Sequence, residues 1–299
     1  MRYNLHVTRT PRTLAIQGLV IFAASLLFSF NALGQKNDKQ TTGPLITRTT
    51  TRHENYRLSY GGTVTLVGAP AGSITIEGWD KNEVDVTASI ELQAPNAAAL
   101  DQLALVNTFA VDVDVNHIRI MTSGTHDRTF MKRVTRNFPK ALIGLPWKLD
   151  YIIKVPAMTG LEVDGGDGPI KLAGVEGALR LNAMKSDANL SLTGGLVAVL
   201  IQSGSLNLTI PARGWHGLGA EVRLASGVLT VALQPGFSAD INADVLRLGE
   251  IKNSFADLKP LDRYSNSPRS MRSRAGSGGA TLIFTVGDGA IVIRQSGAQ

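Results

Sequence analysis

The stretch Gly204-Ser205-Leu206-Asn207-Leu208 carries the pattern on which the fold depends. A small residue is followed by one spacer and then by an apolar, a polar and a second apolar residue. This alternation buries one face of an extended strand and leaves the other face in water. Glycine lets the chain turn with a positive φ before the strand begins. The stretch therefore predicts a short strand that follows a tight turn.

The same unit recurs along the chain. One five-residue strand cannot bury its apolar face alone, whereas stacked copies bury a continuous apolar strip. The further copies are Gly72-Ser-Ile-Thr-Ile76, Gly168-Pro-Ile-Lys-Leu172, Gly177-Ala-Leu-Arg-Leu181, Ala188-Asn-Leu-Ser-Leu192, Gly227-Val-Leu-Thr-Val231, the weak copy Gly249-Glu-Ile251, and Gly289-Ala-Ile-Val-Ile293.

The repeat predicts which side chains form the core and which reach solvent. We expect the polar members Lys171, Arg180, Ser191, Asn207 and Thr230 to point outward. The inward set is Ile170, Leu172, Leu179, Leu181, Leu190, Leu192, Leu206, Leu208, Leu229, Val231, Ile291 and Ile293. Irregular spacing between copies excludes a tight hexapeptide helix. The pattern indicates an all-β fold, a β-solenoid or β-helix-like stack with loops of different lengths, and an immunoglobulin-like β-sandwich is the alternative.

The N-terminal part adds further strands and one helix. A helix is predicted from Asn96 to about Phe109 (residues 96–109), because Asn96 can cap its first turn and alanines 97–99 favour helix. Alternation predicts strands at 63–67, 73–76, 84–90, 111–115 and 118–120.

The first residues read as an export signal. Arg2, Arg9 and Arg12 precede an apolar run from Leu14 to Phe30, which ends in a small-x-small site at 32–34. We expect cleavage after residue 34; a retained anchor helix is the alternative. Removal of three bases and no acid leaves a net charge of 27 − 24 = +3, which gives no argument for nucleic-acid binding. The chain has no cysteine, which excludes a disulfide framework.

Composition divides the chain into four segments. Residues after the signal are polar, Thr-rich and aperiodic, which indicates a flexible lead-in. The expected segments are signal peptide 1–34, lead-in 35–59, a β-repeat domain 60–294 (N-terminal strands plus helix 60–122, basic loop 123–150, repeat stack 151–294) and tail 295–299.

Residues 123–148 combine basic and aromatic side chains. The segment contains a single acid, Asp127, and seven basic residues: His126, Arg128, Lys132, Arg133, Arg136, Lys140 and Lys148. Three aromatic residues are interleaved with them: Phe130, Phe138 and Trp147. One interpretation is a patch for an acidic polysaccharide. The favoured one is a loop whose aromatic rings cover the end of a sheet while its charges stay in water. The Ser/Gly/Arg-rich stretch 263–279 is likewise predicted to be a mobile exposed loop.

Motifs for catalysis and metal binding are absent from the sequence. No Gly-x-Ser-x-Gly, Gly-x-Gly-x-x-Gly or phosphate-binding loop occurs, and the histidines are scattered. The acidic stretch 162–168 suits Ca²⁺ chemistry, but a plain turn is favoured. Asp164, Asp167, Glu176 and Asp187 fall on neighbouring repeats and, if they converged, would allow a carbohydrate-active enzyme. We expect no enzyme, no catalytic or metal-binding residue and no cofactor.

Longer motifs resemble a known family. The motifs that carry the resemblance are Gly72-Ser-Ile-Thr-Ile-Glu-Gly-Trp79-Asp80, Val84-Asp-Val86 and Tyr151-Ile-Ile-Lys-Val-Pro156, followed by the glycine-led repeats. Through them the chain resembles the bacterial putative-adhesin family of β-strand-repeat proteins, a domain of unknown function. The resemblance covers residues 60–294. It implies an exported, surface-associated role and no catalytic residues. The stretches at 186–189 and 247–249 depart from the Gly-Asn-Gly or Gly-Asp-Ile core that such repeats often show.

The resulting functional prediction is a non-enzymatic, adhesin-like binding or scaffold protein of the bacterial envelope. Its partner would be an envelope polysaccharide or protein, with no nucleic acid and no stable membrane span after cleavage. The expected location is the periplasm, the outer cell surface or the medium. One alternative is a regulatory envelope protein that pairs with a partner strand through the edge Ile291–Ile293. The other is a β-helical carbohydrate-active enzyme.

Overall fold

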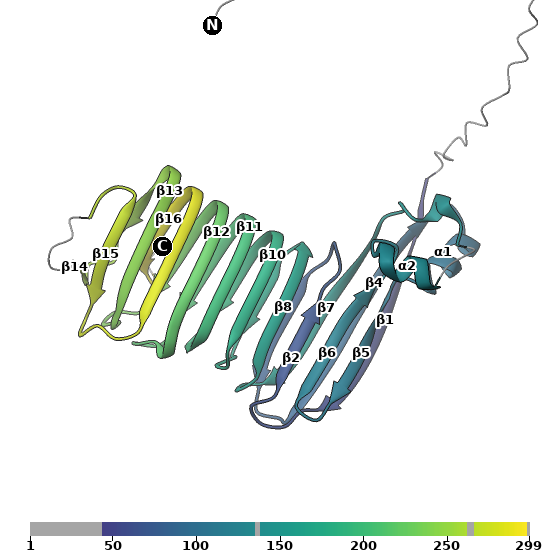
Figure 1. Ribbon diagram of the computed structural model, residues 1–299, viewed down its shortest axis with the longest axis horizontal. Helices are drawn as coiled ribbons and strands as arrows, with labels where there is room; N and C mark the ends of the chain where they lie inside the picture. The colour runs from purple at the N-terminus through teal and green to yellow at the C-terminus, as the bar shows by residue number, and fades with distance from the viewer. Residues whose placement is uncertain (1–43, 135–137, 262–265, 298–299) are drawn as a thin grey trace, which may run out of the picture. The chain divides into compact units, whose positions relative to one another are not determined.

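The structure, a computed structural model, describes residues 44–134, 138–261 and 266–297. These residues belong to one compact unit that extends from Thr41 to Gln299. They are mostly β: sixteen strands form one mixed sheet that does not close on itself, accompanied by two α-helices and one 3-10 turn (Figure 1). The predicted signal peptide lies outside the described residues. Within the described ranges, no helix has the length and apolar character needed to cross a membrane.

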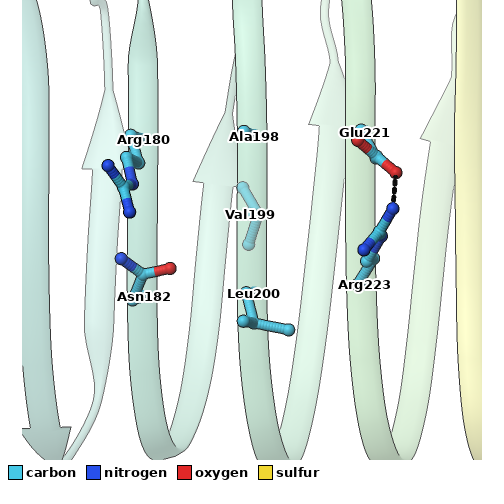
Figure 2. A pocket seen from close by; sticks show the side chains of 7 residues that line it. All are labelled: Arg180, Asn182, Ala198, Val199, Leu200, Glu221 and Arg223. Carbon is cyan, nitrogen blue, oxygen red and sulfur yellow. Dashed lines mark hydrogen bonds and ion pairs between the residues drawn. The ribbon is translucent and has the colours of Figure 1, made fainter.

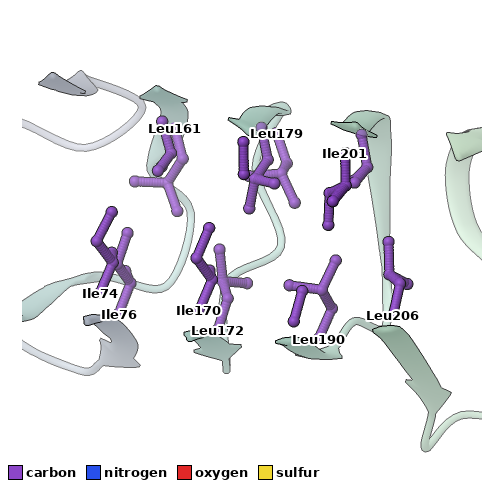
Figure 3. Packing of buried hydrophobic residues seen from close by; sticks show 14 of the residues in the cluster. Ile74, Ile76, Leu161, Ile170, Leu172, Leu179, Leu190, Ile201 and Leu206 are labelled. Carbon is purple, nitrogen blue, oxygen red and sulfur yellow. The ribbon is translucent and has the colours of Figure 1, made fainter. Parts of the chain in front are cut away.

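Five long strands form the centre of the sheet and pair in parallel. In spatial order they are β10 (Leu179–Ser191), β11 (Gly194–Ile210), β12 (His216–Leu233), β16 (Thr281–Gln295) and β13 (Ala239–Asn253). Each long strand contributes its first half to one layer, here called the first layer, and its second half to a facing second layer. Figure 3 shows the two layers, with Leu161, Leu179 and Ile201 facing Leu172, Leu190 and Leu206.

Beyond β10 the two layers continue as separate strands. The first layer extends through β8 (Gly160–Asp167), β2 (Thr63–Val67), β6 (His117–Ser123) and β5 (Thr108–Asp114). The second layer extends through β9 (Ile170–Ala173), β3 (Ile74–Trp79), β7 (Trp147–Pro156), β4 (Glu83–Ala94) and β1 (Ile46–Arg57). Strand pairing is parallel from β6 and β7 through to β13, and antiparallel strands flank this region at both ends.

The predicted core is confirmed. All twelve residues expected to point inward are buried, and Leu179, Leu190, Leu206 and Leu229 expose no more than 3% of their surface. The polar members Lys171, Arg180 and Asn207 are exposed. Strand alternation alone therefore identified the interior face of each repeat.

The register of the repeats differs from the predicted one at two copies. Ser186, and not Ala188, occupies the position of Gly204, so that Ala188 pairs with Leu206. Leu179 of the Gly177 copy pairs with Val197 in the first layer. The Gly204 copy lies in the second layer, so the two copies belong to different layers. Part of the irregular spacing noted in the sequence arises because copies from both layers were aligned as one series; the rest is real, since Gly204 and Gly227 pair in the same layer and are 23 residues apart. Within one layer, Leu161, Leu179 and Val197 follow each other in register at a constant interval of 18 residues.

The strand predicted to be a free edge is a central strand. Ile291 and Ile293 in β16 pair with β12 on one side and with β13 on the other. The backbone hydrogen-bonding groups on both sides of this strand are therefore paired within the chain. The prediction that Ile291–Ile293 adds a partner strand is wrong. Outside β13 in the first layer lies β15 (Ser270–Ala275), antiparallel to β13, followed by β14 (Leu258–Pro260), antiparallel to β15.

Two segments predicted to be flexible or exposed contain strands. Residues 46–57 of the predicted lead-in 35–59 form β1, which pairs with β4 along its whole length. Alternation did not reveal this strand because it is polar on both faces, as suits a sheet edge. Part of the predicted loop 263–279 forms β15, in which Arg272 and Arg274 form ion pairs with Asp244 and Asp240 of β13.

The helical content also differs from the prediction. Helix α1 (Ala97–Ala104) is capped by Asn96, whose Oδ1 accepts a 2.9 Å hydrogen bond from the N–H of Ala99, as predicted. It is shorter than expected because β5 begins at Thr108. The predicted basic loop 123–150 contains helix α2 (Arg128–Val134) and the 3-10 turn η1 (Lys140–Leu142), and its last residues begin β7.

Candidate binding surface

Outward side chains of the first layer form two regular rows across β8, β10, β11 and β12. Backbone register places Glu162, Arg180, Ala198 and Glu221 side by side in one row. It places Asp164, Asn182, Leu200 and Arg223 side by side in the next. Because strand residues alternate between faces, the residues between these rows point into the core. The rows are thus fixed by the buried ladder beneath them.

Arg180 lies at the junction of two shallow hollows in this surface. The first, of about 140 Å³, extends over β10, β11 and β12 (Figure 2) and is lined by Arg180, Asn182, Ala198, Val199, Leu200, Glu221 and Arg223. The second, of about 230 Å³, extends toward β2 and β8 and shares Arg180 and Ala198 with the first. A depression forms between Arg180 and Glu221 because the side chain of Ala198, which lies between them, is small. We call the surface lined by both hollows the Arg180 groove.

Some polar groups of the groove are paired within the chain, whereas Arg180, although it lies in register with Glu162, forms no ion pair with any residue that the structure describes. Arg223 forms an ion pair with Glu221, and Asn182 Nδ2 donates a 2.7 Å hydrogen bond to Asp164 Oδ1. Among the described residues, Arg180 has neither a hydrogen bond nor an ion pair from its side chain. A guanidinium without a partner presents planar N–H donors that suit a carboxylate or phosphate.

Exposed aliphatic side chains surround Arg180. Leu196 and Leu200 of β11, which line the two hollows, expose 56% and 39% of their surface. An arginine surrounded by exposed aliphatic residues is the composition expected of an interaction surface. Sequence analysis had placed Arg180 on an outward face, but it offered no sign that these leucines would surround it.

The acidic residues considered for catalysis do not converge. Asp164 lies on the outer face of the first layer, and Asp187 on that of the second, where its Oδ1 accepts a 2.6 Å hydrogen bond from Ser205. Glu176 accepts a hydrogen bond from Thr193 in a connecting segment. Asp167 ends β8, where it pairs in register with Lys185. The alternative in which neighbouring repeats bring these acids together does not hold, because the chain changes layer between them.

The predicted acidic turn 162–168 is mostly strand. Glu162 and Asp164 alternate outward in β8, where Glu162 accepts a 3.1 Å hydrogen bond from Thr65. The part of the chain that the structure describes contains no group of three His, Asp or Glu side chains placed to hold a metal ion.

In the described part of the segment 123–148, two aromatic side chains pack inward and Arg128, Lys132, Arg133 and Lys140 are exposed, whereas Lys148 forms ion pairs with Glu91 and Asp150. Phe138 and Trp147 pack against the core, and the ring of His126 lies 5.3 Å from that of Trp147. Burial lowers the pKa of His126, which favours its neutral form at neutral pH. Asp127 Oδ1 accepts hydrogen bonds from the N–H groups of Phe130 and Thr129, which lowers the pKa of Asp127 and fixes the first turn of α2.

The structure defines a mostly β repeat protein whose first layer carries shallow hollows on its outer face. No family model and no curated protein sequence matches the chain. Among solved structures it is similar to a putative cell adhesion protein from Clostridium sporogenes, at 9% identity and a TM-score of 0.37, covering 83% of this chain and 100% of that one. It is also similar to a putative adhesin from Bacteroides fragilis, at 10% identity and a TM-score of 0.26, covering 82% and 97% of the two chains.

Proposed function

We propose that this chain is an exported, non-enzymatic, adhesin-like binding protein of the bacterial envelope that contacts its partner through the Arg180 groove. Its architecture is, in this proposal, a β-solenoid-like stack of two-layered repeats. The observation that carries the proposal is the unpaired guanidinium of Arg180 among exposed leucines. Regular strands hold these side chains in place, so binding requires little ordering of the surface.

A protein partner suits the groove better than a sugar chain does. The residues that line the two hollows include no aromatic side chain on which a sugar ring could stack. They combine one unpaired cation with aliphatic surface, which matches an acidic side chain next to apolar ones. We therefore propose an envelope or cell-surface protein as the partner class.

Binding measurements with matched variants test this proposal. The purified chain would be screened against an array of envelope proteins and glycans, and each interaction remeasured with Arg180→Ala and with Lys171→Ala. Lys171 is an equally charged, exposed residue of the second layer. We expect Arg180→Ala to weaken binding by about tenfold or more, as loss of a charged hydrogen-bonding group does, and Lys171→Ala to leave it unchanged. Equal affinities for both variants would rule out the groove.

Two further measurements address the rest of the proposal. N-terminal sequencing of the chain recovered from cell fractions tests export and cleavage after residue 34. A panel of acidic and neutral glycans, monitored for reducing ends and for unsaturated uronate absorbance, tests the enzymatic alternative. Sustained turnover on any of these glycans would contradict the non-enzymatic role.

A further inference from the structure

The insertion between β6 and β7 carries positive charge that the described chain does not neutralise. Arg128, Lys132 and Arg133 of α2 and Lys140 of η1 are all exposed. The acid of this insertion, Asp127, is held by two backbone N–H groups at the start of α2. Within the described ranges, Arg128, Lys132 and Lys140 make no side-chain hydrogen bond or ion pair. The insertion therefore presents a basic patch to solvent.

Exposed aliphatic side chains lie at the same end of the strands as this patch. Leu105, which follows α1, exposes 79% of its surface, Ile143, which follows η1, exposes 42%, and Ile46, at the start of β1, exposes 45%. Each is large enough to favour an apolar environment over water. Nothing in the described chain covers them.

Hydrogen bonds and strand pairing bring these segments to one end of the sheet. The N–H of Thr125 donates a 2.8 Å hydrogen bond to Asn107 Oδ1, which joins the segment after α1 to the segment before α2. The N–H of Gln93 donates to the carbonyl of Pro146 at 3.1 Å, and Ile46 pairs in register with Ala94. Figure 1 shows α1 and α2 at this end, near the start of β1. We call the surface formed by Ile46, Leu105, Ile143 and the four basic residues the helical end.

We propose that the helical end docks reversibly on an anionic lipid surface. Clustered Lys and Arg side chains are attracted to acidic headgroups, and adjacent aliphatic side chains enter the boundary between headgroups and acyl chains. A hydrated acidic polysaccharide would satisfy the charges but would leave the aliphatic side chains in water. The coincidence of both kinds of residue favours lipid over polymer.

This inference is independent of the Arg180 groove. Along the first layer, β6, β2 and β8 run between the α2 insertion and the strand that carries Arg180. The two surfaces use different residues, so a lipid-docked chain keeps its groove open to a partner. Failure of one proposal leaves the other standing.

Vesicle sedimentation tests the proposal with the chain starting at Gln35, which retains the whole compact unit from Thr41 to Gln299. The vesicles contain phosphatidylcholine alone or mixed with phosphatidylglycerol. We expect binding to the mixed vesicles only, and a decrease of affinity with added salt. A variant with Arg128→Gln, Lys132→Gln, Arg133→Gln and Lys140→Gln should lose about a hundredfold or more in affinity.

A matched control separates a local patch from net charge. Lys171→Gln, Lys185→Gln, Arg213→Gln and Lys259→Gln remove the same charge from exposed positions elsewhere, and we expect this variant to bind mixed vesicles like the parent. Circular dichroism shows whether both variants keep the β fold. Equal losses in the two variants would overturn the proposal, because binding would then follow net charge alone.

The aliphatic residues provide a second, charge-neutral test. Leu105→Ser with Ile143→Ser should weaken vesicle binding and make the remaining binding more sensitive to salt. Unchanged affinity in this variant would contradict docking into lipid. Binding to soluble polygalacturonate without binding to mixed vesicles would also contradict it and would assign the helical end to an acidic polymer.

Discussion

Gly227 stacks on Gly204 so closely that a Cβ atom on Gly227 would lie 1.8 Å from the carbonyl oxygen of Gly204. The contact repeats along the sheet, because a Cβ on Gly289 would lie 1.8 Å from the carbonyl of Gly227 and one on Gly249 1.6 Å from that of Gly289. These glycines have φ between 123° and 139°, a region that L side chains rarely adopt. They form a column where β11, β12, β16 and β13 pass from the first layer to the second, and Ser186 takes the same position in β10.

The glycine column should be highly sensitive to added side chains. We expect Gly227→Ala to destabilise the fold by about 3 kcal/mol or more, because it combines an unfavourable φ with a backbone clash. The control is Gly236→Ala, where φ is 72° and a Cβ would meet no atom within 4 Å; it should cost about 1 kcal/mol. Urea denaturation measures both. Similar midpoints for the two variants would show that the column tolerates a Cβ.

One strand provides a matched test of the core. Leu206 and Leu196 both lie in β11, but Leu206 is fully buried and Leu196 exposes 56% of its surface. Leu206→Ala should lower the free energy of unfolding by about 2–5 kcal/mol, whereas Leu196→Ala should change it by less than about 0.5 kcal/mol. Denaturant unfolding of both variants checks the difference. Comparable losses would mean that the inward and outward faces are misassigned.

Tyr56 in the edge strand β1 should lose its proton only at an unusually high pH. Burial, and then its hydrogen bond to Glu54, raise its pKa from 10.0 to about 12. The stabilisation linked to this shift is complete below pH 10 and is lost as the pH rises toward 12, because the unfolded chain releases the proton first. The difference in tyrosinate absorbance between the parent and Tyr56→Phe measures the pKa. A midpoint at the ordinary value would contradict the contact with Glu54.

The ion pair between Arg272 and Asp244 should produce acid sensitivity where β15 meets β13. Burial opposes ionisation of Asp244, but hydrogen bonds from Arg272 (2.7 Å) and Ser270 (2.7 Å) outweigh it and lower the pKa of Asp244 below 3.8. The linked stabilisation is present above pH 3.8 and is lost as the pH falls through the folded-state pKa. Asp244→Asn should therefore cost about 1 kcal/mol at neutral pH and progressively less in acid. Unfolding curves over this range are the measurement.

The more exposed pair Arg119–Asp112 serves as the control for that prediction. Asp112 exposes 57% of its side chain, against 27% for Asp244. Asp112→Asn should therefore change stability by only a few tenths of a kcal/mol. An equal cost at both positions would mean that burial adds nothing to the inner pair.

Local patterns were enough to predict most strands and the core. Leu179, Leu206 and Leu229 were placed inside by alternation alone, and the Asn96 cap was identified from one residue type before an alanine run. Strand β1 was missed because both its faces are polar. Its inward residues include Arg52 and Glu54, which pair with each other and discourage further strands from adding at the edge.

The candidate binding surface was only partly visible in the sequence. Arg180 was predicted to face solvent, yet its neighbours Ala198 and Glu221 come from two other strands. Their proximity depends on the register between strands, and the sequence alignment of the repeats had placed Ala188 two residues away from its true register. The helical end was missed as a surface because its three aliphatic residues come from three separate segments.

The amino-acid sequence by itself determined which face of each strand is buried and where glycine permits the chain to change layer, because both depend on a few consecutive residues. Only the tertiary structure decided which strand lies beside which: the final strand β16 enters between β12 and β13, and β2 with β3 lies between strands that follow later in the chain. Apolar alternation is nearly the same in every repeat, so it does not specify a neighbour. That choice is made by hydrogen bonding and packing between residues distant in the sequence.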